Sequence, residues 1–373
     1  MHTRLHFIDG VLVLHLIIWW SSWNHFACNI DEDLIKQTAQ AMVTTGLANL
    51  GYKYINLDDC WGELGRNSLQ HVLVANPVKF PSGMAALGNY IHNLGLKFGI
   101  YSSAGNYTCS GTMPGSLGHE QADANTFASW GVDYLKYDNC YNDNIHPKIR
   151  YQAMSDALQN TGRPIFYSIC EWGDQQPALW AGEFGNSWRT TDDITDDWES
   201  IMCIADMNDV YAEHAGPGAW NDPDMLEVGN GGMSYDEYVV HFSIWAISKA
   251  PLIIGCDLRN MTNDTLSILS NAEVIAVNQD PLGIQARQVR NYGQRDVWAG
   301  PLSGGRTVVL FVNKKYSTEE MTAFWSDIGV SANQAVQVRD LWLHEDLNTT
   351  MTGNLTVTLL AHSCKMFILT PTS

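Results

Sequence analysis

The sequence has little positive charge. Its 373 residues include 21 Lys and Arg against 40 Asp and Glu, which gives a formal net charge of −19. Nucleic acids and anionic bilayers attract proteins largely through Lys and Arg, so we expect no nucleic-acid partner and no membrane insertion. The surplus of carboxylates favours neutral or cationic ligands instead.

Several chemical motifs are also missing. The eight cysteines include no C-x-x-C pair, which disfavours a zinc ribbon and a thioredoxin-like redox motif. No histidine cluster accompanies the candidate acids, which argues against zinc chemistry and against a Ser-His-Asp triad. We therefore predict no metal and no cofactor.

The N-terminus has no long apolar run. Val11–Ile18 follows Arg4 and resembles the hydrophobic region of a signal peptide, but it is too short to span a membrane. No small-x-small cleavage site follows it. Two interpretations stay open for residues 1–18: a divergent segment left from a signal peptide, or the beginning of a first strand.

Five glycosylation sequons, together with an even number of cysteines, are typical of a secreted glycoprotein with a few disulfides. The sequons begin at Asn106, Asn260, Asn263, Asn348 and Asn354. We expect a secretory-pathway location, either extracellular and in the cell wall or in a vacuole.

Apolar, strand-like runs alternate with helical segments along residues 19–283. The eight runs are Ile17–Trp23, Tyr54–Asp58, Lys97–Ser102, Asp133–Asp138, Pro164–Cys170, Ser187–Thr191, Ala219–Asp222 and Pro251–Cys256. Eight such repeats predict an α/β fold, a (β/α)₈ TIM barrel. A doubly wound open sheet shares this rhythm, but Gly229-Asn-Gly231 does not continue into its phosphate-binding fingerprint.

Residues 284–373 have a different character. Short β-rich runs alternate with polar turns there, and no amphipathic helix is evident. The pattern predicts a C-terminal antiparallel β-sandwich domain after the barrel.

Acidic residues follow most of the predicted barrel strands. In a (β/α)₈ barrel the active site lies at the carboxyl ends of the strands, so these acids meet at one rim. Asp138 ends an apolar strand, where a carboxylate is costly to bury unless it is paired or functional. Lys136, two residues earlier on the same strand face, is a possible partner that keeps Asp138 ionised. Paired carboxylates without a metal suit glycoside hydrolysis, with Asp138 as the nucleophile.

Some of the acids have simpler explanations. An isolated aspartate at a strand end is more often a helix cap or a solvated loop residue, and only the convergence of several strands reverses that preference. Asp196-Asp197 is better explained as the solvated beginning of a helix. The run from Asp192 to Asp197 lacks the alternating ligands and central glycine of a calcium loop.

Six long motifs resemble one family, the α-galactosidases of glycoside hydrolase family 27 (melibiases), and in particular its plant members. The similarity extends from about Trp20 to Thr370. The motifs are Trp23-Asn-His-Phe26, Gly51-Tyr-Lys-Tyr-Ile-Asn-Leu-Asp-Asp-Cys-Trp61, Tyr134-Leu-Lys-Tyr-Asp-Asn-Cys140, Cys170-Glu-Trp-Gly173, Ser187-Trp-Arg-Thr-Thr-Asp-Asp-Ile194 and Gly218-Ala-Trp-Asn-Asp-Pro-Asp-Met225.

The resemblance implies a role for each site residue. Asp138 would be the nucleophile and Asp193, the fourth residue after Arg189, the acid/base. The residues implied to bind substrate are Trp23, Asp58, Asp59, Tyr101, Lys136, Cys170, Trp172, Arg189 and Met225. Among these, Cys170 and Trp172 would read the sugar's 2-position, where their bulk suits a 2-hydroxyl rather than a 2-acetamido group. The implied disulfides join Cys28 to Cys60 and Cys109 to Cys140, which leaves Cys170 free.

Three positions depart from the family pattern. Trp19 stands where the family has glycine, and we expect it to crowd the barrel floor. Ser103 replaces a rim aspartate. Asp192 stands where relatives often have glycine, so it either demands an unusual backbone angle or raises the pKa of one of two adjacent acids.

The sequence thus predicts a hydrolase, a retaining exo-glycosidase that releases terminal α-D-galactosyl groups from galacto-oligosaccharides, galactomannans or galactolipids by double displacement. We expect a monomer or a small homo-oligomer. Alternatives on the same scaffold are an α-N-acetylgalactosaminidase and a β-L-arabinopyranosidase. An alternative of another class is a catalytically weak sugar-binding protein in which the altered first strand prevents turnover.

Overall fold

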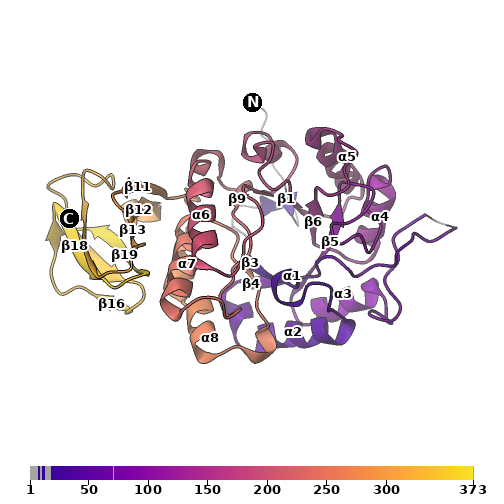
Figure 1. The fold of residues 1–373 in the computed structure, drawn as a ribbon, viewed down its shortest axis with the longest axis horizontal. Coiled ribbons are helices and arrows are strands. Elements are labelled where there is room, and N and C mark those ends of the chain that lie inside the picture. Colours follow the sequence, from indigo (N-terminus) through magenta and orange to yellow (C-terminus); the bar gives the residue numbers. More distant parts are fainter. Residues whose placement is uncertain (1–6, 9–10, 13–17, 70, 373) are drawn as a thin grey trace.

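The computed structural model describes residues 7–8, 11–12, 18–69 and 71–372. Most of residues 1–17 therefore lie outside the described part, and with them most of the segment for which a signal remnant was considered. Two short strands, β1 (Phe7–Ile8) and β2 (Val11–Leu12), pair antiparallel within it. From Ile18 onward the chain forms a barrel of strands and helices, followed by a β-rich domain (Figure 1).

Eight parallel strands form the barrel, as the alternating pattern predicts. They are β3 (Ile18–Ser21), β4 (Tyr52–Asn56), β5 (Lys97–Ser103), β6 (Tyr134–Asp138), β7 (Phe166–Ile169), β8 (Ser187–Arg189), β9 (Trp220–Asp222) and β10 (Ile253–Ile254). Their order in the sheet is β10-β3-β4-β5-β6-β7-β8-β9. A parallel bridge from Leu226, just after β9, to Ile254 in β10 closes the ring. Each predicted apolar run thus overlaps one strand, and six of the eight runs contain their strand entirely. Strand β4 begins two residues before its run, and β5 ends one residue after its run.

Helices connect the strands and cover the outside of the barrel. They are α1 (Trp23–Phe26), α2 (Glu32–Thr44), α3 (Met84–Asn93), α4 (Glu120–Ser129), α5 (Pro147–Asn160), α6 (Trp198–Asp209), α7 (Tyr235–Ile247), α8 (Asn263–Leu269) and α9 (Ala272–Asn278). Helix α2 begins where the Asp31 side chain accepts a hydrogen bond from the backbone N of Leu34 at 2.8 Å. None of the helices in the described part combines the length and the apolar character that a membrane span requires.

The C-terminal domain consists of two antiparallel sheets. The larger sheet contains β11 (Arg287–Asn291), β12 (Arg295–Leu302), β13 (Arg306–Asn313), β15 (Ala335–Asp340), β16 (Glu345–Asp346), β17 (Met351–Thr352) and β19 (Ser363–Pro371). Strands β14 (Glu319–Phe324) and β18 (Asn354–Leu359) form the smaller sheet. Buried apolar side chains from both sheets, among them Phe311 and Val338 of the larger sheet and Met321 and Leu355 of the smaller, form one core between them. The predicted β-sandwich is confirmed.

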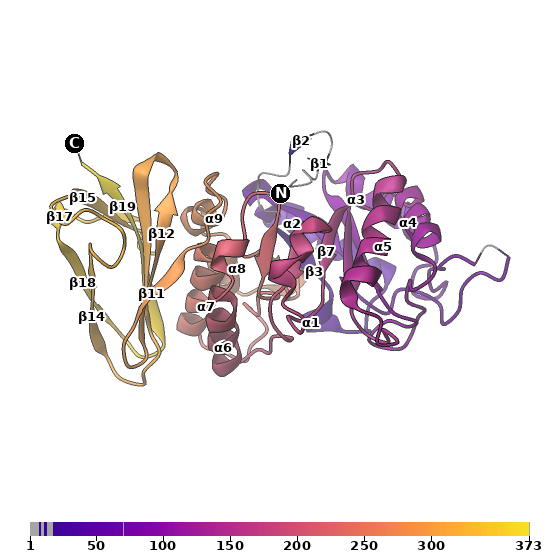
Figure 2. The same ribbon diagram turned by 90° about the horizontal axis from the view of Figure 1, so that it is seen from above.

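Helices α6 and α7 lie between the barrel and the sandwich (Figure 2). Polar contacts cross this boundary. Lys314 Nζ lies 3.0 Å from the carboxylate of Asp206 in α6 and 2.6 Å from that of Asp296 in β12. The Asp296 side chain is fully buried, so Lys314 is the cation that balances it.

Trp19 does not crowd the barrel floor, contrary to the expectation from the sequence. Its indole is 1% exposed and packs against Tyr134 at 5.0 Å and Phe166 at 5.9 Å between ring centroids. Tilted and edge-on aromatic contacts of this kind are favourable. Trp19 also borders an unfilled cavity, so the interior has room for a large residue where the family has glycine.

We expect Trp19→Ala to lower the free energy of unfolding by about 3–5 kcal/mol, because it leaves a large cavity inside the barrel. Trp19→Phe should keep most of the stability, since a ring still reaches Tyr134. Thermal unfolding followed by far-UV circular dichroism measures both variants. A Trp19→Ala protein as stable as the wild type would show that Trp19 is strained after all.

We expect Lys314→Met to cost about 3 kcal/mol, because it leaves the buried Asp296 carboxylate without its cation. The adjacent Lys315 is the matched control. It pairs with Glu319 at 3.3 Å but is one-third exposed, and Lys315→Met should cost less than about 1 kcal/mol. Equal melting temperatures for the two variants would contradict a structural role for Lys314.

Candidate active site

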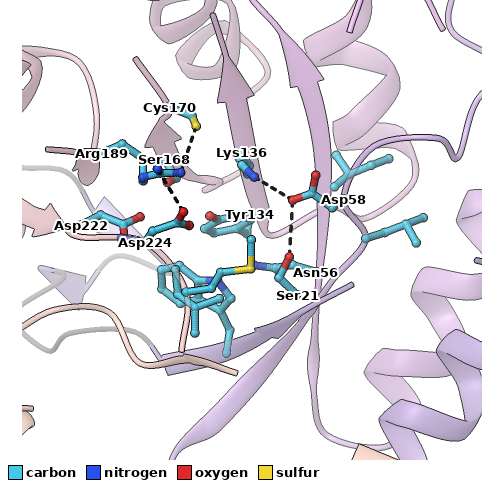
Figure 3. A pocket seen from close by; sticks show the side chains of 15 residues that line it. Ser21, Asn56, Asp58, Tyr134, Lys136, Ser168, Cys170, Arg189, Asp222 and Asp224 are labelled. Carbon is cyan, nitrogen blue, oxygen red and sulfur yellow. Dashed lines mark hydrogen bonds and ion pairs between the residues drawn. The ribbon is translucent and has the colours of Figure 1, made fainter. Parts of the chain in front are cut away.

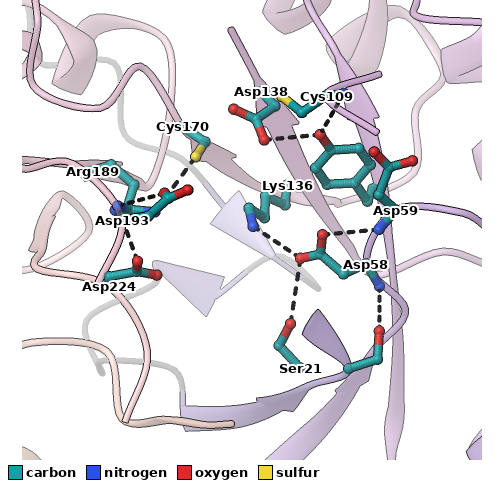
Figure 4. A network of polar contacts seen from close by, with 12 residues as sticks. Ser21, Asp58, Asp59, Cys109, Lys136, Asp138, Cys170, Arg189, Asp193 and Asp224 are labelled. Carbon is teal, nitrogen blue, oxygen red and sulfur yellow. Dashed lines mark hydrogen bonds and ion pairs between the residues drawn. The ribbon is translucent and has the colours of Figure 1, made fainter. Parts of the chain in front are cut away.

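A pocket of about 150 Å³ opens where the barrel strands end. It contains every predicted site residue except Cys170. These residues are Trp23, Asp58, Asp59, Tyr101, Lys136, Asp138, Trp172, Arg189, Asp193 and Met225. The parallel strands end at one rim, which explains why residues more than 200 positions apart meet there (Figure 4).

Asp138 is the last residue of β6 and is 6% exposed. The Tyr101 hydroxyl donates to its Oδ2 at 2.8 Å, and the backbone N of Asn139 donates to its Oδ1 at 2.9 Å. Burial raises the pKa of Asp138 above its usual value, although the Lys136 charge and both hydrogen bonds act in the opposite direction. The carboxylate is thus held in a fixed orientation.

Lys136 forms its ion pair with Asp58 rather than with Asp138. Its Nζ lies 2.9 Å from Asp58 Oδ2, and both side chains are largely buried. The charge of Lys136 does lower the pKa of Asp138, as the sequence predicts. Burial raises that pKa by more, so Lys136 does not by itself keep Asp138 ionised.

Asp58 and Asp59 are both oriented by backbone donors. The backbone N of Asp59 donates to Asp58 Oδ1 at 2.9 Å, and that of Ser110 donates to Asp59 Oδ2 at 2.9 Å. Burial raises the pKa of Asp59, and the hydrogen bonds that it accepts from the backbone of Ser110 and Cys60 partly offset this rise. The two carboxylates can accept hydrogen bonds from sugar hydroxyls without having to reorient.

Asp193 lies nearer the mouth of the pocket and is held by Arg189. The guanidinium contacts Asp193 Oδ1 at 3.1 Å and Asp224 Oδ2 at 3.0 Å. Partial burial raises the pKa of Asp193, but the positive charges of Arg189 and Lys136 lower it by more. The pKa of Asp193 is therefore below its usual value. The expected rise caused by a neighbouring Asp192 is therefore wrong for Asp193. Asp192 also does not adopt a positive φ, so the loss of glycine there costs no backbone strain.

A sharp turn holds Trp172 at the pocket wall. Trp172 has a φ of 62° and Gly173 a φ of 82°. A Cβ on Gly173 would lie 2.3 Å from the carbonyl oxygen of Thr190, so only glycine fits against that strand end. The turn therefore fixes where the indole stands.

A second cavity lies directly beneath the pocket (Figure 3). Cys170 lies on it and also contacts Arg189, whose Nη1 is 3.8 Å from its Sγ. Burial raises the pKa of the Cys170 thiol, so it remains neutral. Burial also raises the pKa of Asp222 to about 6. The side-chain amide of Asn56, at the cavity wall, has no hydrogen-bond partner among the described residues.

The structure joins Cys28 to Cys60 and Cys109 to Cys140, the pairs that the family resemblance implies. Cys109, Asp138 and Cys140 form the one group of metal-ligand residue types found in the described part of the chain. Their two sulfurs are bonded to each other, so they offer no thiolate to a metal.

Asn24, Ile194 and Asp224 also line the pocket. Asp224 is one of the acids that the sequence places at the strand ends, but no role was predicted for it, nor for Asn24 and Ile194. Asp224 is positioned by its contact with Arg189, and its only sequence signal is its place two residues after β9. Asn24 and Ile194 lie beside predicted residues in conspicuous motifs, but nothing in their residue types indicated a role.

Comparisons with known proteins agree with this geometry. A family profile described as "Alpha galactosidase A" matches residues 17–280, and one described as "Alpha galactosidase C-terminal beta sandwich domain" matches residues 292–369. An α-galactosidase from Coffea arabica is 60% identical over 99% of this chain and 97% of its own. "Alpha-galactosidase 2" from Arabidopsis thaliana is 59% identical over 97% of this chain and 91% of its own.

Solved structures show the same similarity. α-Galactosidase I from Mortierella vinacea superposes with a TM-score of 0.94 and 42% identity, over 97% of this chain and 98% of its own. A β-L-arabinopyranosidase from Geobacillus stearothermophilus reaches a TM-score of 0.87 at 26% identity, over 96% of each chain. The chain belongs to the α-galactosidases of glycoside hydrolase family 27.

Within that family the chain is of the plant type. It is a glycoside hydrolase, an α-galactosidase that removes terminal α-galactosyl groups from its substrates. The alternatives on the same scaffold are not favoured, because identity to the plant α-galactosidases is much higher than to the arabinopyranosidase.

Tyr101→Phe should shift the acidic limb of the kcat/KM profile to higher pH by about 0.5–1 unit. Its hydroxyl stabilises the Asp138 carboxylate, and the loss of a hydrogen bond to a charged group raises the pKa of that group further. As the nucleophile that we propose below, Asp138 attacks only in its ionised form, so activity is lost as the pH falls through this pKa. Hydrolysis of p-nitrophenyl α-galactoside between pH 3 and 8 gives the profile.

Tyr52→Phe is the matched control. The buried Tyr52 hydroxyl donates to the backbone oxygen of Leu269, at the end of α8, and does not contact Asp138. Its profile should keep the wild-type limb. If Tyr101→Phe also keeps it, then the acidic limb does not report Asp138.

Proposed function

We propose that the chain cleaves α-galactosides by a retaining double displacement in which Asp138 is the nucleophile and Asp193 the acid/base. The proposal is supported above all by the fixed orientation of the buried Asp138 carboxylate. Asp193 lines the same pocket and is much more exposed than Asp138. Retaining glycosidases need such a pair, one acid to attack and one to transfer protons.

In the first step an oxygen of Asp138 forms a bond to the anomeric carbon while the bond to the leaving oxygen breaks. Protonated Asp193 gives its proton to that oxygen. In the second step Asp193 takes a proton from water, the water oxygen bonds to the anomeric carbon, and the ester to Asp138 breaks. Two inversions give α-galactose.

The lowered pKa of Asp193 belongs to the pocket without substrate, where Arg189 contacts it directly. A sugar hydroxyl that accepts a hydrogen bond from Arg189 draws the guanidinium away from Asp193 and favours its protonated form. Arg189 also retains Asp224 as a partner when it turns to the substrate. Substrate binding thus prepares the acid.

Substrate recognition follows from the side chains around Asp138. Asp58, Asp59 and Lys136 bind the hydroxyls at the 4- and 6-positions, where charged groups give strong hydrogen bonds. Trp23 and Met225 pack against the apolar face of the ring. Trp172 borders the 2-position, and its bulk admits a hydroxyl more readily than an acetamido group. Cys170, for which the same role was expected, does not line this pocket but the second cavity, where it contacts Arg189.

The setting of the enzyme is also part of the proposal. All five sequon asparagines are exposed, which suits a glycoprotein of the secretory pathway, outside the cell or in a vacuole. Raffinose-type oligosaccharides, galactomannans and galactolipids all carry the terminal group that the pocket takes. We propose a monomer or small homo-oligomer that does not bind nucleic acid.

Asp138→Asn should reduce kcat/KM for every α-galactoside by at least about a thousandfold, because the amide cannot form the glycosyl ester. Asp193→Asn should reduce the hydrolysis of melibiose far more than that of α-galactosyl fluoride, whose leaving group needs no proton. Initial-rate assays on both substrates separate the two roles.

Asp197→Asn is the control. It lies four residues beyond Asp193, is exposed, and caps α6, a role that asparagine also performs. Its activity should remain that of the wild type. If Asp192→Asn lost activity on melibiose while Asp193→Asn kept it, the acid/base role would belong to Asp192. Detection of β-galactose as the first product by NMR would exclude a retaining mechanism.

A further inference from the structure

Arg150 is a buried cation that the proposed mechanism does not use. It lies in the first turn of α5, is 2% exposed, and forms no ion pair within the described residues. Its guanidinium donates instead to three neutral oxygens: Ile145 O at 2.7 Å, Ala104 O at 3.0 Å and Asn139 Oδ1 at 2.6 Å. Buried charges are normally paired, so the purpose of this one has to be sought in the groups that it holds.

Two of these acceptors flank the strand end that carries Asp138. Ala104 directly follows β5, and Asn139 directly follows β6. The ladder between the two strands ends at the pair Ser103 and Asp138. Beyond that pair, the backbone N of Ala104 donates to Asp138 O at 2.8 Å. Arg150 binds the carbonyl of Ala104 and the side chain of Asn139, so it continues the connection past the last rung of the ladder.

Asn139 extends this connection to the Asp138 carboxylate. It is 5% exposed, its side-chain Oδ1 accepts from Arg150, and its backbone N donates to Asp138 Oδ1 at 2.9 Å. A contact to the side chain of Asn139 restrains its backbone as well, because the residue is enclosed. A chain of short contacts thus leads from helix α5 to the proposed nucleophile.

We propose that Arg150 is a positioning residue for the nucleophile, which it holds through Asn139 and Ala104 without touching the substrate. The inference rests on the proposed role of Asp138 and adds to it. Arg150 does not line the galactosyl pocket. An attacking carboxylate needs an accurate position, since a displacement of about 1 Å can cost a hundredfold in rate.

The loops that follow β5 and β6 are packed closely against each other. A Cβ on Gly105 would lie 1.9 Å from the carbonyl oxygen of Cys140, so a larger residue would push the loops apart. The disulfide between Cys109 and Cys140 joins the same two loops. Arg150 connects both of them to α5, and the strand end that carries the carboxylate is therefore held by a helix as well as by its neighbouring loop.

The shape of the guanidinium matters more here than its charge. The charge of Arg150 lowers the pKa of Glu171 and of Tyr137, which burial raises. Apart from burial, the largest effect on the pKa of Asp138 is the charge of Lys136. A planar fork reaches several acceptors at once, whereas the ammonium of a lysine is a compact point charge. Lysine at position 150 should therefore replace arginine only in part.

The test compares Arg150→Met and Arg150→Lys with Arg163→Met. Arg163 is the matched control, because it donates to Val132 O at 2.6 Å and to Gly131 O at 3.0 Å and pairs with Asp133, all before the opposite end of β6. Hydrolysis of p-nitrophenyl α-galactoside between pH 3 and 8 gives kcat and kcat/KM. Inhibition by galactose reports binding to the pocket.

We expect Arg150→Met to lose about tenfold or more in kcat, with the inhibition constant of galactose within about twofold of wild type. The acidic limb of kcat/KM should move to higher pH by about 0.5 unit. A weaker hydrogen bond from Asn139 raises the pKa of Asp138, and only the ionised carboxylate attacks. Arg150→Lys should show a smaller change in the same direction. Arg163→Met should lower the melting temperature but keep the limb, since loss of folded protein lowers the rate equally at every pH.

Asn139→Ala tests the same link if Arg150→Met does not fold. It removes one acceptor and leaves the guanidinium its two backbone carbonyls, and it should also lower kcat and shift the limb. Arg150→Lys/Asn139→Ala should lose no more than the larger single loss, whereas independent roles would multiply the two losses.

A wild-type limb and kcat in Asn139→Ala would overturn the positioning role. So would full kcat in Arg150→Lys, multiplied losses in the double variant, or the same shift of the limb in Arg163→Met. A wild-type enzyme without activity, or full activity of Asp138→Asn, would instead overturn the proposed function.

Discussion

Closure of the parallel sheet is the constraint on which the rest of this structure depends. Eight strands from distant parts of the chain end at one rim, and the last closure is made by the bridge between Leu226 and Ile254. Closure brings Lys136, Arg189 and several carboxylates into one small, largely buried space. Charges in such a space are stable only as partners, so Lys136 pairs with Asp58 and Arg189 with Asp224 and Asp193.

This pairing divides the two proposed catalytic acids by environment. Asp138 is buried at a strand end with two hydrogen-bond donors, and its pKa is raised. Asp193 is more exposed and contacts Arg189, and its pKa is lowered. Two carboxylates in different surroundings can take different roles, one as nucleophile and one as proton carrier. The substrate itself then has to release Asp193 from Arg189.

Trp19 illustrates how a departure from the family pattern is absorbed. A tryptophan in place of a glycine would overfill a tightly packed interior, yet here it meets Tyr134 and Phe166 beside an unfilled cavity. The same cavity extends under Asp58, Lys136 and Arg189. The floor of the site is therefore an aromatic layer, and an unfilled cavity lies between it and the charged groups.

The sequence by itself determined the repeat of strand and helix, the change to a β-rich C-terminal part, and the family motifs that carry the candidate site. Those features are local, since period, turn residues and strand-end acids are visible within short stretches. Only the tertiary structure decided that Lys136 pairs with Asp58 rather than Asp138, that Trp19 has room, and that Asp224 pairs with Arg189. Each of these depends on distances between residues far apart in the chain, and no local pattern records which of several nearby charges lies closest once the barrel closes.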